Sequence, residues 1–407
     1  MAKQHLEPTD PAATAGPPQA PCVTGGDALA SYLRAQATEF LRALRLHRET
    51  GAGAHVTGTQ GAAARGTGTQ GAAARGTGAH AAPDGAAPDG PVDAARALRR
   101  AARRLSGTLH TFQPLLDTEW AESMRPELAW LSGTLALEHA YASRLERLLQ
   151  ALHRLSGTAL LPSQQQAGRT TATVSAPLAP TATRPSPTDR GSLTVGAAKA
   201  GALLDRQLTL ARTRAHSTAL QALGSSRFHA VADKVALLAS EVPLKDTTVP
   251  TTDLRPLAAA ARDRLTDAVT ALPLVTAGNP YNAQALIHGL SPAPAPHPQD
   301  TQWHQVRLLL RLHRYALEVL SGEHADETDG ETDGGTDVRL LAAGEALDRH
   351  RDASEAAAAA AQAARTPRIA PATAYALGVL HADQRHEVEA ARYAFQHSWR
   401  KEPIRLP

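Results

Sequence analysis

Residues 303–318 decide the fold of this chain, and they read Trp303-His304-Gln305-Val306-Arg307-Leu308-Leu309-Leu310-Arg311-Leu312-His313-Arg314-Tyr315-Ala316-Leu317-Glu318. On an α-helix, which turns by about 100° per residue, four of these basic residues fall on one stripe. They are His304, Arg307, Arg311 and Arg314, with Tyr315 at the margin of the stripe. Leucine and valine occupy most of the opposite face. The sequence therefore predicts a helix that buries one face and presents a basic row roughly 15 Å long, which suits an extended anion better than a small one.

A second basic helix is predicted upstream, in residues 92–105. Arg96, Arg99 and Arg103 repeat the spacing of three and four residues, and Arg104 follows directly. Leucines take the opposite face of this helix as well. The two stretches lie about half a chain length apart, so we interpret the chain as an internal duplication with one basic helix in each half.

The composition is rich in arginine. Lys and Arg together number 42, of which only five are lysine, while aromatic residues make up 3%. The codon bias of a GC-rich genome would explain the amount of arginine, but it would not place arginine on matching helical faces. Arginine is the side chain best suited to forked contacts with phosphate. Because the net charge is only +3, the basic character is local, and we expect no strong positive electrostatic field around the protein as a whole.

Several protein classes are disfavoured by what the sequence lacks. The single cysteine, Cys22, excludes an intramolecular disulfide framework. The first residues have no apolar core of a signal peptide, and no apolar run approaches the 18 residues of a membrane span. We therefore expect a soluble, cytoplasmic protein without membrane partners.

The two basic helices resemble those of the CHAD family (conserved histidine α-helical domain). The spacing His-x-x-Arg-x-x-x-Arg that begins at His304, followed by Arg314-Tyr315-Ala316-Leu317-Glu318, is similar to the second signature helix of that family. Residues 95–105, followed by Phe112, resemble the first signature helix, and His350-Arg351-Asp352 resembles a further motif. The resemblance extends from about residue 27 to residue 401.

This resemblance implies an all-α fold of two pseudo-symmetric four-helix bundles around a basic groove or pore. It also implies binding of inorganic polyphosphate through both stripes, with Tyr315 and Asp352 in support. Asp352 is interpreted as the partner that orients an arginine and not as a metal ligand. The predicted polyphosphate-binding residues are Arg96, Arg99, Arg103, Arg104, His304, Arg307, Arg311 and Arg314.

The chain departs from the family pattern mainly in its first half. Arg96 stands where the family has its first histidine, and Ser106 stands where another arginine is usual. His139-Ala140 replaces an Arg-Asp pair, and Leu312 replaces a basic residue of the second helix. We therefore expect the first half to be eroded and the second half to dominate binding.

Composition shifts divide the chain around these helices. Two tandem decapeptides, 57–66 and 67–76, carry no apolar face and are interpreted as part of a flexible insertion. A long amphipathic helix is predicted from Glu119 to about Leu155, with Pro126 as a candidate break. The predicted organisation is a disordered tail 1–26, a first CHAD half 27–242 with low-complexity insertions 51–91 and 162–192, a linker 243–252, a second CHAD half 253–401 with an acidic insertion 323–337, and a tail 402–407.

Motifs of catalytic phosphate or metal chemistry are incomplete. Gly191 and Gly196 have the glycine spacing of a phosphate-binding loop, but Ala197 replaces its lysine. His386 begins a zinc-protease motif in which Ala390 replaces the second histidine. None of the 18 histidines has another three or four residues away, so no helix face offers a chelating pair. We expect no catalytic residue, no metal and no cofactor, although a metal held by histidines distant in the sequence is left open.

The function predicted from these features is non-enzymatic binding of inorganic polyphosphate. The alternatives are a helical scaffold that binds the backbone of nucleic acid, an accessory protein of a triphosphate- or polyphosphate-processing enzyme, and a phosphohydrolase. Nucleic acid is disfavoured as a partner, because few aromatic residues are available to stack on bases. A polyphosphate granule or an enzyme of phosphate metabolism is the further candidate partner, which would place the cytoplasmic protein at such granules.

Overall fold

The structure is a computed structural model, and it describes residues 25–63, 91–156, 187–245, 253–278, 297–324 and 334–400. Apart from one isolated bridge between Leu116 and Leu244, the described residues contain helices and no strands. The predicted all-α fold is confirmed. No helix within these ranges combines the length and apolar character needed to cross a lipid bilayer. The predicted tails, most of the linker 243–252 and large parts of the three insertions lie outside the described residues.

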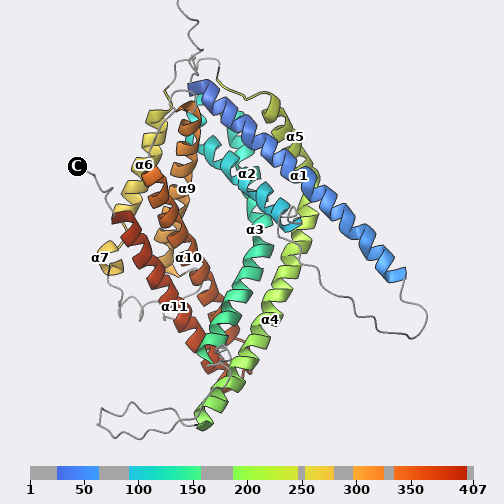
Figure 1. Cartoon of the computed structure of the whole chain (residues 1–407), viewed down its shortest axis with the longest axis vertical. Helices are drawn as coiled ribbons and strands as arrows, with labels where there is room; N and C mark the ends of the chain where they lie inside the picture. The colour runs from blue at the N-terminus through green and yellow to red at the C-terminus, as the bar shows by residue number, and fades with distance from the viewer. Residues whose placement is uncertain are drawn as a thin grey trace, which may run out of the picture.

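The described residues form α-helices, most of them long, and one short 3₁₀ turn (Figure 1). In chain order they are α1 (Gly25–Ala63), α2 (Pro91–Thr111), η1 (Gln113–Leu115), α3 (Thr118–Leu155), α4 (Pro187–Leu223), α5 (Ser226–Ser240), α6 (Arg255–Thr270), α7 (Leu274–Ala277), α9 (Pro298–His324), α10 (Gly334–Ala364) and α11 (Pro371–Arg400). The two predicted basic helices are α2 and α9. Their apolar faces are buried as expected, because Leu98, Leu105, Val306 and Leu310 are all almost fully inaccessible.

Several helix starts follow from local chemistry. Asp117 caps α3 by accepting a hydrogen bond from the Trp120 backbone N–H at 2.7 Å, and Ser225 caps α5 in the same way with Phe228. The α9 helix begins at Pro298. Backbone N–H groups in a first helical turn have no partner within the helix, so the missing N–H of proline costs no hydrogen bond there. The cap of α3 and the proline of α9 define the starts of two helices that line the site described below.

Several helices differ from the sequence prediction, among them α10, which begins at Gly334 inside the predicted acidic insertion 323–337. α1 continues to Ala63, into the predicted insertion, because extending an existing helix requires one new hydrogen bond per residue and no new nucleus. α4 begins at Pro187, before the predicted end of the second insertion. α3 is not broken at Pro126, because Met124 and Leu128 are fully buried on either side and hold both turns against the core.

Three hydrophobic cores hold the helices together. The first joins α1, α2, α5 and the first half of α3 to parts of α6 and α9, and the third joins α6, α9, α10 and α11. The second core joins α3 and α4 to α10 and α11, so the first and second cores each include helices of both predicted halves. In Figure 1, α3 and α4 converge with α10 and α11 at the lower end of the molecule. The pseudo-symmetry of two separate bundles stays a prediction.

The two basic helices approach each other closely at Gly107. A Cβ atom added to Gly107 on α2 would lie 2.6 Å from the ring of Tyr315 and 3.2 Å from Leu312, both on α9. Real Cβ atoms do not approach other atoms so closely, so this contact requires glycine. Gly107 therefore sets the distance between the arginine rows of α2 and α9.

Candidate functional site

A cavity of about 600 Å³ lies between α2, α3, α9, α10 and α11. Its charged lining consists of eight arginines and five carboxylates, so its positive charge is in excess. The arginines are Arg99 and Arg103 on α2, Arg144, Arg147 and Arg154 on α3, Arg307 and Arg311 on α9, and Arg351 on α10. Because these guanidinium groups come from four different helices, the cavity can contact an anion from several sides at once.

The two predicted arginine stripes meet at this cavity. Arg99 and Arg103 from the first stripe and Arg307 and Arg311 from the second all line it. Each pair is spaced i, i+4, which places both members of the pair on one face of their helix. Asp352, predicted as a supporting residue, lines the cavity as well.

Other predicted residues lie away from the cavity lining. The guanidinium of Arg104 instead grips Glu318, with Nε donating to Oε2 at 2.8 Å and an Nη donating to Oε1 at 3.3 Å. The Tyr32 hydroxyl donates to the same carboxylate at 2.7 Å, so Glu318 joins α1, α2 and α9. Tyr315 is the residue that contacts Gly107 at the crossing of α2 and α9. Arg104 and Tyr315 are therefore placed to stabilise the helix crossing.

Arg96, His304 and Arg314 are also absent from the cavity lining. An Nη of Arg96 lies 3.4 Å from Nδ1 of His139, which does line the cavity. His304 packs edge-on against His350, with ring centroids 5.6 Å apart. His304 and Arg314 are the two end residues of the predicted stripe, and they lie beyond Arg307 and Arg311, the residues of α9 that line the cavity.

Sequence reasoning missed a third arginine stripe on α3. Arg144, Arg147 and Arg154 step by three and seven residues, a spacing that keeps them on one helical face. The same period identifies the stripes on α2 and α9 and could have identified this one. Arg351 was recognised within a family-like motif but was not predicted as a ligand contact.

Arg99 and Arg103 are half-buried cations on the α2 wall of the cavity. Neither makes an ion pair within the described ranges, and the Nε of each is buried without a hydrogen-bond partner there. Burial, together with the neighbouring charges of Arg103 and Arg311, lowers the pKa of Arg99 to about 10. Burial likewise lowers the pKa of Arg103, although Tyr315 and Asp348 oppose the shift. Such groups are destabilising unless an anion compensates them.

The arginines of the opposite wall are paired. Asp348 accepts hydrogen bonds from Nε of Arg307 and, at 2.8 Å, from an Nη of Arg311. Burial nevertheless lowers the pKa of Arg307 to about 10, and Arg311 adds to this effect while Asp348 opposes it. The orienting role predicted for Asp352 thus belongs, for these two arginines, to Asp348.

Glu355 pairs with two further arginines of the cavity in the same way. It accepts a hydrogen bond from Arg144 of α3, and at 2.8 Å one from Nε of Arg351. Burial raises the pKa of Asp352, which lies between Asp348 and Glu355 on the same face of α10, and Arg147 and Arg351 oppose that shift. The carboxylates of α10 therefore run alongside the arginine rows.

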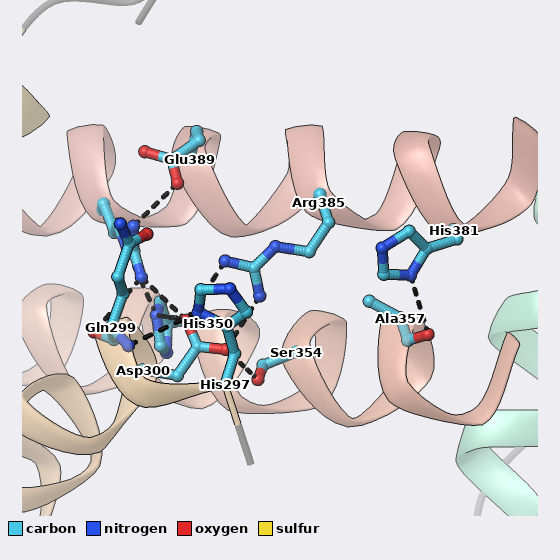
Figure 2. Close-up of polar contacts among 10 residues, drawn as sticks. His297, Gln299, Asp300, His350, Ser354, Ala357, His381, Arg385 and Glu389 are labelled. Carbon is cyan, nitrogen blue, oxygen red and sulfur yellow. Dashed lines mark hydrogen bonds and ion pairs between the residues drawn. The ribbon is translucent and has the colours of Figure 1, made fainter. Parts of the chain in front are cut away.

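A separate, buried polar cluster anchors the start of α9 (Figure 2). Asp300 is fully inaccessible and accepts hydrogen bonds from Arg385 at 2.7 Å, Arg392 at 2.7 Å and Ser354 at 2.6 Å. His350 Nε2 lies 3.5 Å from the same carboxylate. Because these partners come from α10 and α11, Asp300 fixes the position of α9, and with it that of Arg307 and Arg311.

The buried cluster also perturbs proton affinities. Burial alone would raise the pKa of Asp300, but hydrogen bonds from His350 and Arg385 outweigh it and hold the pKa far below its usual range. Burial lowers the pKa of His350 to about 4, although Asp300 opposes the shift. His350 is therefore neutral and Asp300 ionised at neutral pH, while Nδ1 of His350 and Nε of Arg385 are buried without a hydrogen-bond partner in the described part of the chain.

No group of three or more potential ligands among His, Cys, Asp and Glu gathers into a metal-binding arrangement within the described residues. In a comparison with known protein families, the sequence model of the CHAD domain matches residues 77–359. The chain belongs to the CHAD domain family.

The CHAD match includes α2, α3, α9 and most of α10, but it ends before α11. A solved structure, PptA from Streptomyces chartreusis, is 61% identical, with a TM-score of 0.66. That likeness covers 93% of this CHAD protein and 100% of the PptA chain. No curated protein matches the chain.

Proposed function

We propose that this CHAD protein binds inorganic polyphosphate in the arginine-lined cavity and does not hydrolyse it. The family resemblance supplies the ligand class, and the cavity supplies groups of the right chemistry, because planar guanidinium groups form bidentate contacts with phosphate oxygens. The volume of about 600 Å³ is in the range of small-molecule pockets. An unbranched chain can be threaded through such a space, whereas a nucleic-acid duplex is too wide for it.

The observation that carries the proposal is a pair of cations, Arg99 and Arg103, that form no direct ion pair among the described residues. Both are half-buried, and their Nε groups have no partner in the described part of the chain. A protein maintains such a cluster against mutual repulsion when an anion compensates it in the working state. Successive phosphates would be held by these two residues and by Arg307 and Arg311 across the cavity.

A binding role without catalysis accords with the side chains that line the cavity. Its titratable residues are arginines, carboxylates and His139. The carboxylates Asp348 and Glu355 are already hydrogen-bonded to arginines, which leaves them poorly placed to activate a water molecule. Attraction to the polyanion and release of its counterions would supply much of the affinity.

Competition binding tests the proposal against its alternatives. Fluorescent polyphosphate is bound at one fixed salt concentration and displaced by unlabelled polyphosphate, RNA or DNA. We expect polyphosphate to compete at far lower phosphate concentrations than either nucleic acid. Equal competition by RNA or DNA would favour the scaffold that binds nucleic-acid backbones.

Release of orthophosphate is measured in parallel, with and without Mg²⁺. We expect no release above the background of a protein-free sample in either condition. Sustained release would identify a phosphohydrolase and overturn the non-catalytic part of the proposal. Co-sedimentation with polyphosphate granules tests whether the cytoplasmic protein associates with them, as we also propose.

A further inference from the structure

On the α9 wall of the cavity, a carboxylate of the protein itself neutralises the arginines. Asp348 on α10 contacts both Arg307 and Arg311 of α9, and the Arg307 side chain is only 15% exposed. Half of the Asp348 side chain, 50%, remains exposed, so its carboxylate can turn toward solvent without being buried elsewhere. The carboxylate thus occupies the guanidinium edges that a phosphate would need.

Glu355 repeats this arrangement two helical turns farther along α10. It pairs with Arg144 of α3 and with Arg351 of its own helix, and its side chain is 30% exposed. The spacing of seven residues places Asp348 and Glu355 on the same face of α10. Both carboxylates line the cavity, and each holds two of its arginines.

The first wall differs, because Arg99 and Arg103 of α2 have no ion pair within the described ranges. A polyanion that enters the cavity therefore meets two kinds of arginine. The α2 arginines gain a partner at once, whereas Arg307 and Arg311 must exchange Asp348 for a phosphate. Once the first phosphates are held, later exchanges take place within one complex and benefit from a high effective concentration.

We propose that Asp348 and Glu355 are internal competitors of the ligand: they neutralise arginines of the cavity and are displaced when polyphosphate binds, so that they set its affinity and salt dependence. This inference rests on the proposed function. Each displaced carboxylate also stays near the bound chain and repels it, which reduces the number of charges that the ligand neutralises.

The test is polyphosphate binding by the full-length Asp348→Asn variant over a series of salt concentrations. Removal of one competitor that holds two arginines should raise the affinity roughly three- to tenfold, given typical strengths of partly exposed ion pairs. It should also make the slope of log K against log salt steeper by about 0.7, since one more positive charge is available to the chain.

Glu318→Gln is the matched control. Its carboxylate also holds an arginine, Arg104, and the substitution changes the net charge by the same amount, but Glu318 does not line the cavity. We expect its salt slope to stay unchanged. Glu355→Gln should repeat the effect of Asp348→Asn, and it replaces that variant if circular dichroism shows that Asp348→Asn is unfolded.

The possible results separate the inference from the proposed function. If the carboxylates only orient the arginines, Asp348→Asn and Glu355→Gln will bind more weakly, with an unchanged salt slope, and the inference is overturned. If the wild-type protein binds no polyphosphate at all, the proposed function fails and the inference fails with it. Stronger binding by Glu318→Gln to the same extent would attribute the effect to net charge alone and would also overturn the inference.

Discussion

Replacement of Arg99 by glutamine should make the ligand-free protein more stable while it weakens polyphosphate binding. Folding brings the Arg99 guanidinium close to Arg103 and Arg311 and partly removes it from water, which lowers its pKa to about 10 from an ordinary value of 12.5. A difference of that size corresponds to about 3 kcal/mol against the charged form. Because the side chain is only partly buried, solvent screening reduces this to roughly 1–2 kcal/mol.

Glutamine preserves helix propensity and most of the aliphatic stem, so the apolar face of α2 should pack as before. Arg99→Gln should therefore raise Tm by about 2–4 °C in protein freed of bound anions by high salt and dialysis. Arg100→Gln is the matched control, because it removes the same charge from the next residue, which is exposed. Differential scanning calorimetry measures both variants in one low-salt buffer.

Added polyphosphate should reverse this order of stability. Ligand binding stabilises the native state by RT ln(1 + [L]/Kd), so the wild-type Tm should rise steeply with polyphosphate and that of Arg99→Gln should rise less. If Arg99→Gln lowers the Tm of the ligand-free protein relative to Arg100→Gln, the Arg99 charge is already compensated. That result would refute the reasoning from buried, unpaired cations.

Three further predictions concern salt, packing and pH. Binding should weaken as salt is added. The slope of log K against log salt should lie between about −2, if the ligand neutralises only the net charge of the cavity lining, and about −6, if it neutralises all eight arginines. A slope near zero would contradict counterion release. Gly107→Ala should lower the free energy of unfolding by about 1–3 kcal/mol, because its Cβ would overlap the Tyr315 ring, whereas Gly133→Ala on α3, with nothing within 4 Å, should stabilise slightly; equal melting temperatures would show that α2 and α9 do not cross so closely. Since the folded pKa of His350 is about 4 and its unfolded pKa is about 6.5, its contribution to stability is present above pH 6.5 and is lost as the pH falls toward 4. Urea denaturation at pH 7 and pH 4.5 measures how much unfolding free energy each protein loses on acidification. This loss should be smaller for His350→Gln than for the wild type or for the exposed control His386→Gln. If His350→Gln loses as much as the wild type, a group other than His350 is responsible for the pH dependence.

The sequence was sufficient to predict the two basic helices, and four of the eight residues predicted to bind polyphosphate line one cavity. Periodicity identifies α2 and α9 because each carries a clear apolar face opposite its arginines, and the i, i+4 pairs Arg99–Arg103 and Arg307–Arg311 do line one cavity. The expected dominance of the second half stays a prediction. The structure gives a reason to test it, since Arg99 and Arg103 of α2 have no ion pair in the described residues, whereas Arg307 and Arg311 of α9 share Asp348.

The remaining features depend on contacts between residues far apart in the chain. Nothing near Arg104 in the sequence indicates that Glu318 holds it, because the two helices meet only in the folded protein. The burial of Asp300 beneath Arg385 and Arg392 depends on the packing of α11, and no local pattern predicts it. Pro126 misleads for the same reason, since tertiary packing overrides its local preference and keeps α3 continuous.

The most direct test of the central claim is a binding titration with polyphosphates of graded length, in which two charge-matched variants are compared. In the first, Arg99, Arg103, Arg307 and Arg311 of the cavity are changed to glutamine. In the second, four exposed arginines outside the cavity lining are changed to glutamine, namely Arg34, Arg100, Arg206 and Arg214. The account predicts that the cavity variant loses at least about a hundredfold in affinity for long chains, since each charge-assisted contact contributes roughly 1.5–3 kcal/mol. The surface variant should lose less than about tenfold. Equal losses in the two variants would contradict the assignment of the cavity as the polyphosphate site.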